Sequence, residues 1–277
     1  MNIFYAVQAT GNGHISRAME LLPYLQQIGN VDIFLSGDNS HLPLDAPVRF
    51  RSKGISLFYN CRGGLDYWKI WNDLKPLRVK KEIRDLPVEN YDLVLNDFDY
   101  ITSAACARKK IPSIHFGHQA SFQSPCCPRP AVKNLAGEWL LKKYVKANHL
   151  IGLHFKSYDD FILPAVVKKE ILEATPADHG YITVYLPSYC EQQLHAVFST
   201  LPGFRFEVFS KECTHPCEAG NIQFKPVNKK MFNQSLINCH GLITGAGFET
   251  PAEALHLGKK MIVIPIRGQY EQACNAA

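Results

Sequence analysis

GLITGAGFETPAEALHLGKKMIVIPIRGQYEQACNA, residues 241–276, is the stretch that decides the fold. An apolar run at 241–244 ends in a glycine turn at 245–247, a helical segment covers 251–257, and a second apolar run covers 261–264. This order is typical of a parallel sheet whose strands are joined by helices. Such sheets bind ligands beyond the carboxyl ends of their strands, where glycine turns expose backbone N–H groups at helix N-termini. The glycine turn is therefore a candidate ligand site.

The chain before this stretch repeats the same alternation of apolar runs and helical segments. Proline and charged residues interrupt the pattern near 164–179, which indicates a connector. The sequence therefore predicts an α/β protein with two Rossmann-like domains, at 1–164 and 165–277. The chain stops where another helix is expected to start, so we expect the second domain to be incomplete. The other expected strands are 3–8, 31–35, 48–51, 57–59, 91–95, 112–116, 181–186, 204–209 and 222–224, and the other expected helices are 15–28, 75–84, 101–109, 133–149, 191–201 and 231–238.

The composition is that of a globular protein, with 46% hydrophobic and 20% charged residues. The sequence contains no run of eighteen apolar residues that could span a bilayer, and the N-terminus lacks the features of a signal peptide. We therefore expect a cytoplasmic protein. Its 9 cysteines are odd in number and scattered, which favours reduced thiols over a disulfide framework. The net charge of +5 comes without a nucleic-acid-binding motif, so we expect no nucleic-acid partner.

Positive charge is concentrated in the expected helices at 75–84 and 133–149. A solvated helix face is the favoured interpretation of both. The second helix also combines large apolar side chains with lysines, which suits the headgroup zone of a membrane. Peripheral contact with the inner face of a membrane therefore stays open as the alternative. The residues concerned are Trp139, Leu140, Leu141 and Tyr144, with Lys142, Lys143 and Lys146.

Polar side chains follow three of the expected strands in the first domain. The segment Gly11-Asn12-Gly13-His14 follows the first strand, and its two glycines leave room for a ligand. Asp97 ends a buried strand, where it could orient His14 or cap the next helix. His118 follows another strand and is a second acid/base candidate. A histidine bonded within its own loop is an equally open interpretation of His118.

In the second domain, acidic residues follow two strands of the deciding stretch. Glu253 lies in the first turns of the helix after Gly245 and Gly247. Its carboxylate could accept both hydroxyls of a ribose while the preceding amides hold a diphosphate. Glu271 and Gln272 follow the next strand, on the same edge of the sheet. Each feature alone is equally typical of a solvated or capping residue, but together they favour a nucleotide site.

Residues 241–276 resemble the donor-binding signature of the GT-B glycosyltransferases of families 1 and 28. The segments GNGHISRA (11–18) and NDFDYITSAACARKKIPSIHFGHQ (96–119) resemble a bacterial and archaeal branch of that superfamily. The resemblance implies the GT-B fold, transfer of a sugar from a nucleotide-sugar donor and no further cofactor. UDP is the favoured nucleotide because these families mostly use it. The acceptor is open, and a lipid-linked molecule is one option.

The resemblance assigns roles to the donor-side residues. Glu253 matches the acid that binds the nucleotide ribose. Glu271 and Gln272 match the acidic–Gln pair that contacts the donor sugar. Gly245 stands where many family 1 members have a phosphate-binding histidine, so the diphosphate is expected on backbone amides and Thr250.

His14 matches the histidine of the first loop, which in many relatives is the catalytic base or an acceptor contact. On this resemblance, Gly11 and Gly13 lie on the acceptor side, and His118 is a second acid/base or acceptor-binding candidate. The resemblance thus implies an inverting transfer in which a base takes the acceptor's proton and a helix N-terminus stabilises the departing diphosphate. Asp97 and Asp99 form an acid-x-acid triplet like the metal-binding element of the other glycosyltransferase fold. That element belongs to a single-domain architecture that this chain does not resemble, so metal binding is the less favoured interpretation.

Two alternatives to a glycosyltransferase remain open. A sugar epimerase of the same two-domain fold also binds nucleotide sugars, although the additional acids that it needs cannot be assigned in this sequence. A non-catalytic protein that binds nucleotide sugars is the other alternative. The fate of the sugar distinguishes the two enzymes, and product formation distinguishes an enzyme from a binder.

Overall fold

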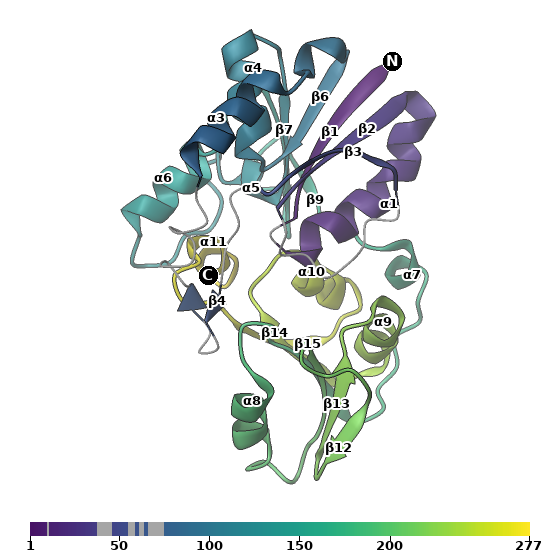
Figure 1. The fold of residues 1–277 in the computed structure, drawn as a ribbon. Coiled ribbons are helices and arrows are strands. Elements are labelled where there is room, and N and C mark those ends of the chain that lie inside the picture. Colours follow the sequence, from purple (N-terminus) through teal and green to yellow (C-terminus); the bar gives the residue numbers. More distant parts are fainter. Residues whose placement is uncertain (10, 38–45, 55–58, 61–63, 66–74) are drawn as a thin grey trace. The chain divides into compact units, whose positions relative to one another are not determined.

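The computed structural model describes residues 1–9, 11–37, 46–54, 59–60, 64–65 and 75–277. The chain forms two compact units, each with its own sheet (Figure 1). Unit 1 comprises Met1–Phe58 and Asp66–Val166, and unit 2 comprises Tyr59–Leu65 and Val167–Ala277. Both sheets are dominated by parallel strands, which confirms the predicted α/β fold class.

Unit 1 contains a parallel sheet of seven strands in the order β3-β2-β1-β6-β7-β8-β9. The chain moves outward from β1 to β2 and β3 and then returns to the other side of β1 with β6. This reversal creates a switch point between β1 and β6, the place where open α/β sheets bind ligands. The strands are β1 (Asn2–Gln8), β2 (Asn30–Ser36), β3 (Val48–Ser52), β6 (Leu93–Asp97), β7 (Ile114–Gly117), β8 (His149–His154) and β9 (Ile162–Pro164).

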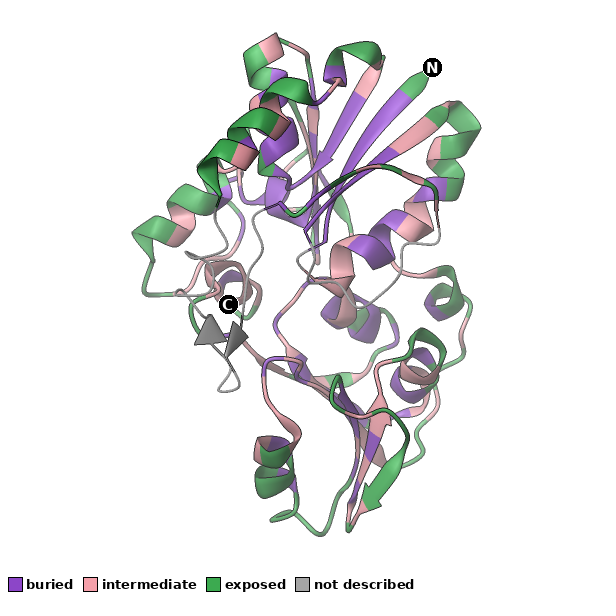
Figure 2. Ribbon diagram, in the orientation of Figure 1, coloured by how far each residue is buried: buried purple, intermediate pink, exposed green. Residues whose placement is uncertain are grey.

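Helices cover both faces of the unit 1 sheet. Successive side chains of β1 point to opposite faces of the sheet and pack against different helices. Ile3, Tyr5 and Val7 pack in a cluster with α1, whereas Phe4 and Ala6 pack in a second cluster with α3 and α4. β1 is therefore buried on both sides, while the outer faces of the helices are exposed (Figure 2). The helices of this unit are α1 (Asn12–Ile28), α3 (Pro76–Asp85), α4 (Tyr100–Lys109), α5 (His118–Ser121) and α6 (Leu135–Lys143), with a 3₁₀ turn at Val88–Asn90.

Unit 2 contains a sheet of six strands in the order β12-β13-β11-β10-β14-β15, in which β12 alone is antiparallel to its neighbour. Its switch point lies between β10 and β14, so the turn after β14 occupies a ligand-binding position. The strands are β10 (Tyr181–Tyr185), β11 (Arg205–Ser210), β12 (Cys217–Ala219), β13 (Ile222–Pro226), β14 (Gly241–Gly245) and β15 (Lys260–Ile264). In addition, β4 (Tyr59–Asn60) pairs antiparallel with β5 (Gly64–Leu65). The helices are α7 (Lys169–Leu172), α8 (Glu191–Phe198), α9 (Lys229–Asn238), α10 (Glu249–His256) and α11 (Tyr270–Asn275).

The structure differs from the predicted elements in the region after α5. The helix expected at 133–149 ends at Lys143, and β8 begins at His149, where the sequence analysis placed the end of that helix. The short strands β9 and β12 were also not predicted.

The strand expected at 57–59 begins outside the described residues. Leu141 is buried and Tyr144 packs on Phe98, so these two side chains do not belong to the exposed face of α6.

Gly29 is the C-cap residue of α1. Its backbone is extended rather than left-handed. A Cβ atom at this position would lie 2.3 Å from the carbonyl oxygen of Met1, so close approach of the first strand requires glycine here.

Among the residues that the structure describes, no helix is long and apolar enough to cross a membrane. The eight cysteines in this part of the chain are free thiols.

Candidate active site

The first candidate residues lie where β1 leads into α1. Gly11 is the N-cap of α1, and a Cβ atom there would meet nothing within 4 Å. Gly13 and His14 follow in the first turn of the helix. The His14 side chain is 14% exposed. Because Val7 of β1 pairs with Asp97 of β6, this turn lies beside the carboxyl end of β6, at the switch point.

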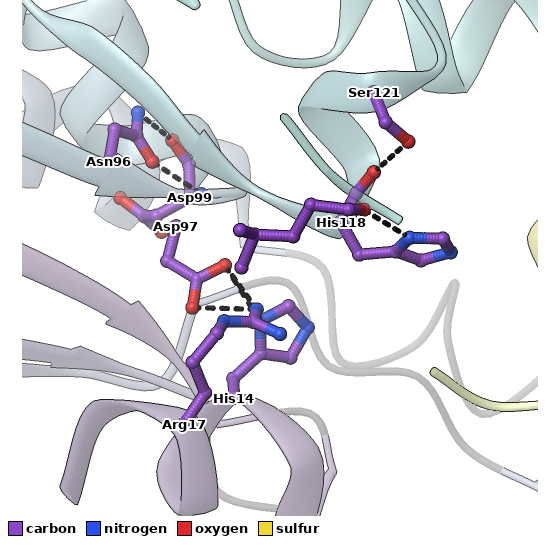
Figure 3. Close-up of polar contacts among 8 residues, drawn as sticks. His14, Arg17, Asn96, Asp97, Asp99, His118 and Ser121 are labelled. Atoms are coloured by element: carbon purple, nitrogen blue, oxygen red, sulfur yellow. Dashed lines mark hydrogen bonds and ion pairs between the residues drawn. The ribbon is translucent and has the colours of Figure 1, made fainter. Parts of the chain in front are cut away.

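His14, Arg17 and Asp97 form a compact polar cluster (Figure 3). The His14 Nδ1 atom lies 2.9 Å from Asp97 Oδ1. The Arg17 Nη2 atom donates to Asp97 Oδ1 at 2.8 Å and to Oδ2 at 2.9 Å, and it lies 3.0 Å from His14 Nδ1. The structure thus places Asp97 against His14, the first of the two positions that the sequence left open.

The buried charges of this cluster compensate each other. The Asp97 and Arg17 side chains are 0% and 1% exposed. Burial by itself would raise the pKa of the Asp97 carboxyl, but Arg17 and then His14 outweigh burial and lower that pKa to about 2. Asp97 is therefore a carboxylate at any physiological pH. A carboxylate at Nδ1 favours the imidazole tautomer with its proton on Nδ1.

Asp99 performs a different task from Asp97. Its carboxylate caps α4 by accepting from the Thr102 backbone N–H at 2.6 Å. Asn96 fixes the same turn, because its side chain accepts from the Asp99 N–H and donates to the Asp99 carbonyl. Phe98 between the two acids has a φ of 59°, in the left-handed region. This turn directs the two carboxylates to separate partners.

Gly117 and His118 lie at the end of β7. Gly117 has a φ of 121°, and a Cβ atom there would lie 2.7 Å from Asp97 Oδ1 and 3.2 Å from Arg17 Nη2. Glycine is therefore required beside the cluster. His118 is buried, and its Nδ1 lies 2.9 Å from the Leu153 carbonyl oxygen, with its ring against Phe122. The partner of His118 thus belongs to the neighbouring strand β8, 35 residues away, and not to its own loop. His14 and Asp97, in contrast, are brought together.

In unit 2 the glycine turn lies between β14 and α10. Gly245 ends β14, and Gly247 precedes the helix; both are half-buried. A Cβ atom at Gly247 would meet nothing within 4 Å, so packing does not explain the glycine there. The N-cap residue of α10 is Phe248, which has no polar side chain for the first helical amides. Thr250 in the first turn is half-buried, and the turn has the chemistry of an anion site.

Glu253 is buried in α10, and its side chain is 2% exposed. The Lys168 Nζ atom lies 2.9 Å from its Oε1 and 3.1 Å from its Oε2. Lys168 also donates to Asn233 Oδ1 at 3.2 Å, and Asn233 donates to Glu170 Oε2 at 2.7 Å. The charge of Glu253 is therefore compensated by a lysine from the segment that opens unit 2.

Side chains of helix α11 form hydrogen bonds with the loop after β14 and with the loop after β15. Gln272 Oε1 accepts from the Ile266 backbone N–H at 3.0 Å, and Asn275 Nδ2 donates to the Ala246 carbonyl at 3.0 Å. Gln272 Oε1 would also lie 3.6 Å from a Cβ atom at Gly245. Glu271 begins the same helix and is half-buried. Gln272 therefore lies beside the glycine turn, with its amide nitrogen left for another partner.

The sequence analysis missed Arg17, Lys168 and Asn275. Arg17 had one usable signal, since it lies one helical turn after His14 on a face that otherwise carries apolar residues. Lys168 had none, because its partner Glu253 is 85 residues away. Asn275 lies within the stretch that was assigned to the donor site, without a role of its own.

The chain was compared with protein-family models, curated proteins and solved structures. The family model described as Glycosyl transferase family 1 matches residues 1–277. No curated protein matches the chain. Among solved structures, the glycosyltransferase SnogD from Streptomyces nogalater has 15% identity and a TM-score of 0.55, and the match covers 99% of this chain and 83% of that chain.

Two further solved structures share the fold. Phytolacca americana UGT2, complexed with UDP-2fluoro-glucose and pterostilbene, has 14% identity and a TM-score of 0.58, covering 99% of this chain and 82% of that one. Acinetobacter baumannii MurG has 16% identity and a TM-score of 0.54, also covering 99% and 82%. At these identities the likeness concerns the fold.

Proposed function

Since the chain belongs to glycosyl transferase family 1 and is thus a glycosyltransferase, we propose that it moves a sugar from a UDP-sugar donor to an acceptor hydroxyl with inversion. Unit 2 binds the donor, and unit 1 supplies the base. The glycine turn of unit 2 is the observation that carries the donor assignment. Its open space, the N-terminus of α10 and the acid Glu253 stand together at a switch point.

The donor would be held by three groups of contacts. The diphosphate binds the amides around Gly247 and the hydroxyl of Thr250, because a helix N-terminus carries partial positive charge. The ribose hydroxyls donate to Glu253, and the sugar contacts Glu271 and Gln272. Solved relatives in complex with UDP or UDP-sugars support this choice of nucleotide.

His14 is the proposed base. In an inverting transfer, the acceptor oxygen attacks the anomeric carbon while a base takes its proton and the nucleoside diphosphate leaves with the bonding electrons. Asp97 holds the proton on Nδ1, so Nε2 is the accepting atom. The developing charge on the departing diphosphate is stabilised by the N-terminus of α10.

The fate of a labelled sugar tests this function. The protein is incubated with a panel of sugar-labelled nucleotide sugars and a mixture of alcohol, phenol and lipid-linked acceptors. We expect label to move to an acceptor with release of an equal amount of nucleoside diphosphate. Return of the sugar as its epimer would identify an epimerase, and tight binding of the intact donor without turnover would identify a binding protein.

Transfer is expected to proceed without a metal ion. Within the part of the chain that the structure describes, no group of three His, Cys, Asp or Glu side chains is arranged to hold a metal, and Asp97 and Asp99 have separate partners. An excess of chelator should therefore change the initial rate less than about two-fold, since the helix N-terminus holds the diphosphate. Loss of activity in chelator, with recovery on adding manganese, would contradict this prediction.

The exposed side chains of α6 and of the residues just before and after it support contact with an anionic membrane surface on the acceptor side. Val132, Leu135, Trp139 and Leu140 are 85%, 84%, 63% and 39% exposed. Exposed lysines lie in the same segment as these apolar side chains. The apolar side chains could insert into a membrane surface, and the lysines could attract anionic lipids. The exposed lysines are Lys133, Lys142, Lys143 and Lys146.

Vesicle sedimentation tests this surface. Replacing both Leu135 and Trp139 with glutamate should weaken binding to vesicles containing anionic lipid at least about ten-fold, because it removes apolar contact and adds repulsion. Val197→Glu on α8 is the matched control, since Val197 is a comparably exposed apolar residue of unit 2. Equal sedimentation of the double variant and the wild type would remove α6 from any membrane contact.

A further inference from the structure

We propose that Arg17 is a positioning residue for the His14–Asp97 pair: its guanidinium fixes Asp97 and keeps the His14 imidazole in the uncharged, proton-accepting form. This inference rests on the proposed role of His14 as the base.

The geometry singles out Arg17. A single nitrogen atom, Nη2, reaches both oxygens of Asp97 and also lies 3.0 Å from His14 Nδ1. Asp97 Oδ1 is therefore shared between the guanidinium and the imidazole. Burial of both Arg17 and Asp97 fixes this arrangement, since neither charge can be solvated by moving outward. Gly117 contributes by leaving the space that the shared contact occupies.

The electrostatic consequence follows from the charge of arginine. In an isolated His–Asp pair, the carboxylate stabilises the imidazolium and makes the histidine more basic. Here the Arg17 guanidinium compensates the charge of the Asp97 carboxylate. If His14 were protonated, its imidazolium would lie 3.0 Å from the guanidinium, and the two positive charges would repel each other. Arginine keeps its charge at every working pH, so this opposition to a second cation is permanent. Arg17 therefore opposes protonation of His14 in the free enzyme.

Three other titratable residues near the cluster do not oppose this effect. The buried His115 of β7 pairs with Asn96 of β6, and burial lowers its pKa to about 4, so it is uncharged. His118 is directed to the Leu153 carbonyl. Asp99 is engaged at the N-terminus of α4, and burial raises its pKa. Among the residues that the structure describes, Arg17 on the same helix and Asp97 on β6 are charged groups within hydrogen-bond distance of His14.

An NMR titration of the His14 ring tests the proposal without requiring turnover. The His14 signal is assigned by its loss in His14→Gln. We expect Arg17→Gln to raise the pKa of His14 by about one unit or more, because it removes a cation within hydrogen-bond distance and frees Asp97. Arg17→Lys restores a cation and should bring the pKa of His14 back toward the wild-type value. An unchanged pKa in Arg17→Gln, even with a lower Tm, would show that Arg17 is only structural and would overturn the proposal.

Arg17→Gln leaves the buried Asp97 carboxylate without its cation, which could prevent folding. A second comparison tests the proposal in that case. The double variant Arg17→Gln/Asp97→Asn has neither charge and is compared with Asp97→Asn, which keeps Arg17. The pKa of His14 should be lower in the single variant by about one unit. Equal pKa values would overturn the proposal. The sugar-transfer assay decides separately whether His14 acts as a base, so the two ideas can fail independently.

Discussion

Replacing His14 with alanine is expected to lower turnover about 10²–10⁴-fold, the range typical of losing a general base. Nucleotide affinity should change little, because the donor is assigned to unit 2. The loss should therefore fall on kcat, measured with saturating donor. Stability should also change little, since the His14 side chain is partly exposed and Arg17 still compensates Asp97.

The control for this prediction is His149→Ala. His149 is exposed at the start of β8, at the opposite end of the same sheet. Its replacement should leave turnover within about two-fold of the wild type. If His14→Ala instead lowers the Tm and keeps the rate per folded molecule near wild type, then His14 only packs the turn, and the base must be sought elsewhere.

Replacing Glu253 with alanine is expected to weaken UDP binding by about 10- to 100-fold. Loss of a charge-assisted hydrogen bond costs roughly 1.5–3 kcal/mol, which corresponds to this range. The variant should also be destabilised, because Lys168 would keep its charge in a largely buried position without its partner. Calorimetry with UDP and thermal unfolding on the same preparation measure the two effects.

The double variant Lys168→Met/Glu253→Met separates binding from stability. It replaces the buried pair with apolar side chains, so most of the lost stability should return. UDP affinity should stay low, because the acceptor of the ribose hydroxyls is still absent. Recovery of UDP affinity together with stability would mean that Glu253 acts through packing alone, and unchanged affinity in Glu253→Ala would remove it from the nucleotide site.

The sequence predicted those parts of the fold whose signals are local. Strands that are buried on both faces give continuous apolar runs, as in β1 and β14, and glycines mark the turns that follow them. β8 was missed because its HLIGLH segment follows a lysine-rich helix without a breaker residue. The short strands β9 and β12 lacked a periodic signal altogether.

The candidate site was predictable where a residue's chemistry and its place at a strand end coincide, as for His14 and the glycine turn of unit 2. Pairing between distant residues was not predictable. The contacts of Arg17 with Asp97 and of Lys168 with Glu253 join residues that are 80 or more positions apart. Such contacts depend on strand order and register, which periodicity alone does not determine.

A structure of the protein soaked with a UDP-sugar tests the central claim most directly, because it locates the donor. The account predicts ribose hydroxyls at the Glu253 carboxylate and the diphosphate against the amides around Gly247. It also predicts the sugar beside Glu271 and Gln272. Donor density away from the turn between β14 and α10, with Glu253 still bonded only to its protein partners, would contradict the account.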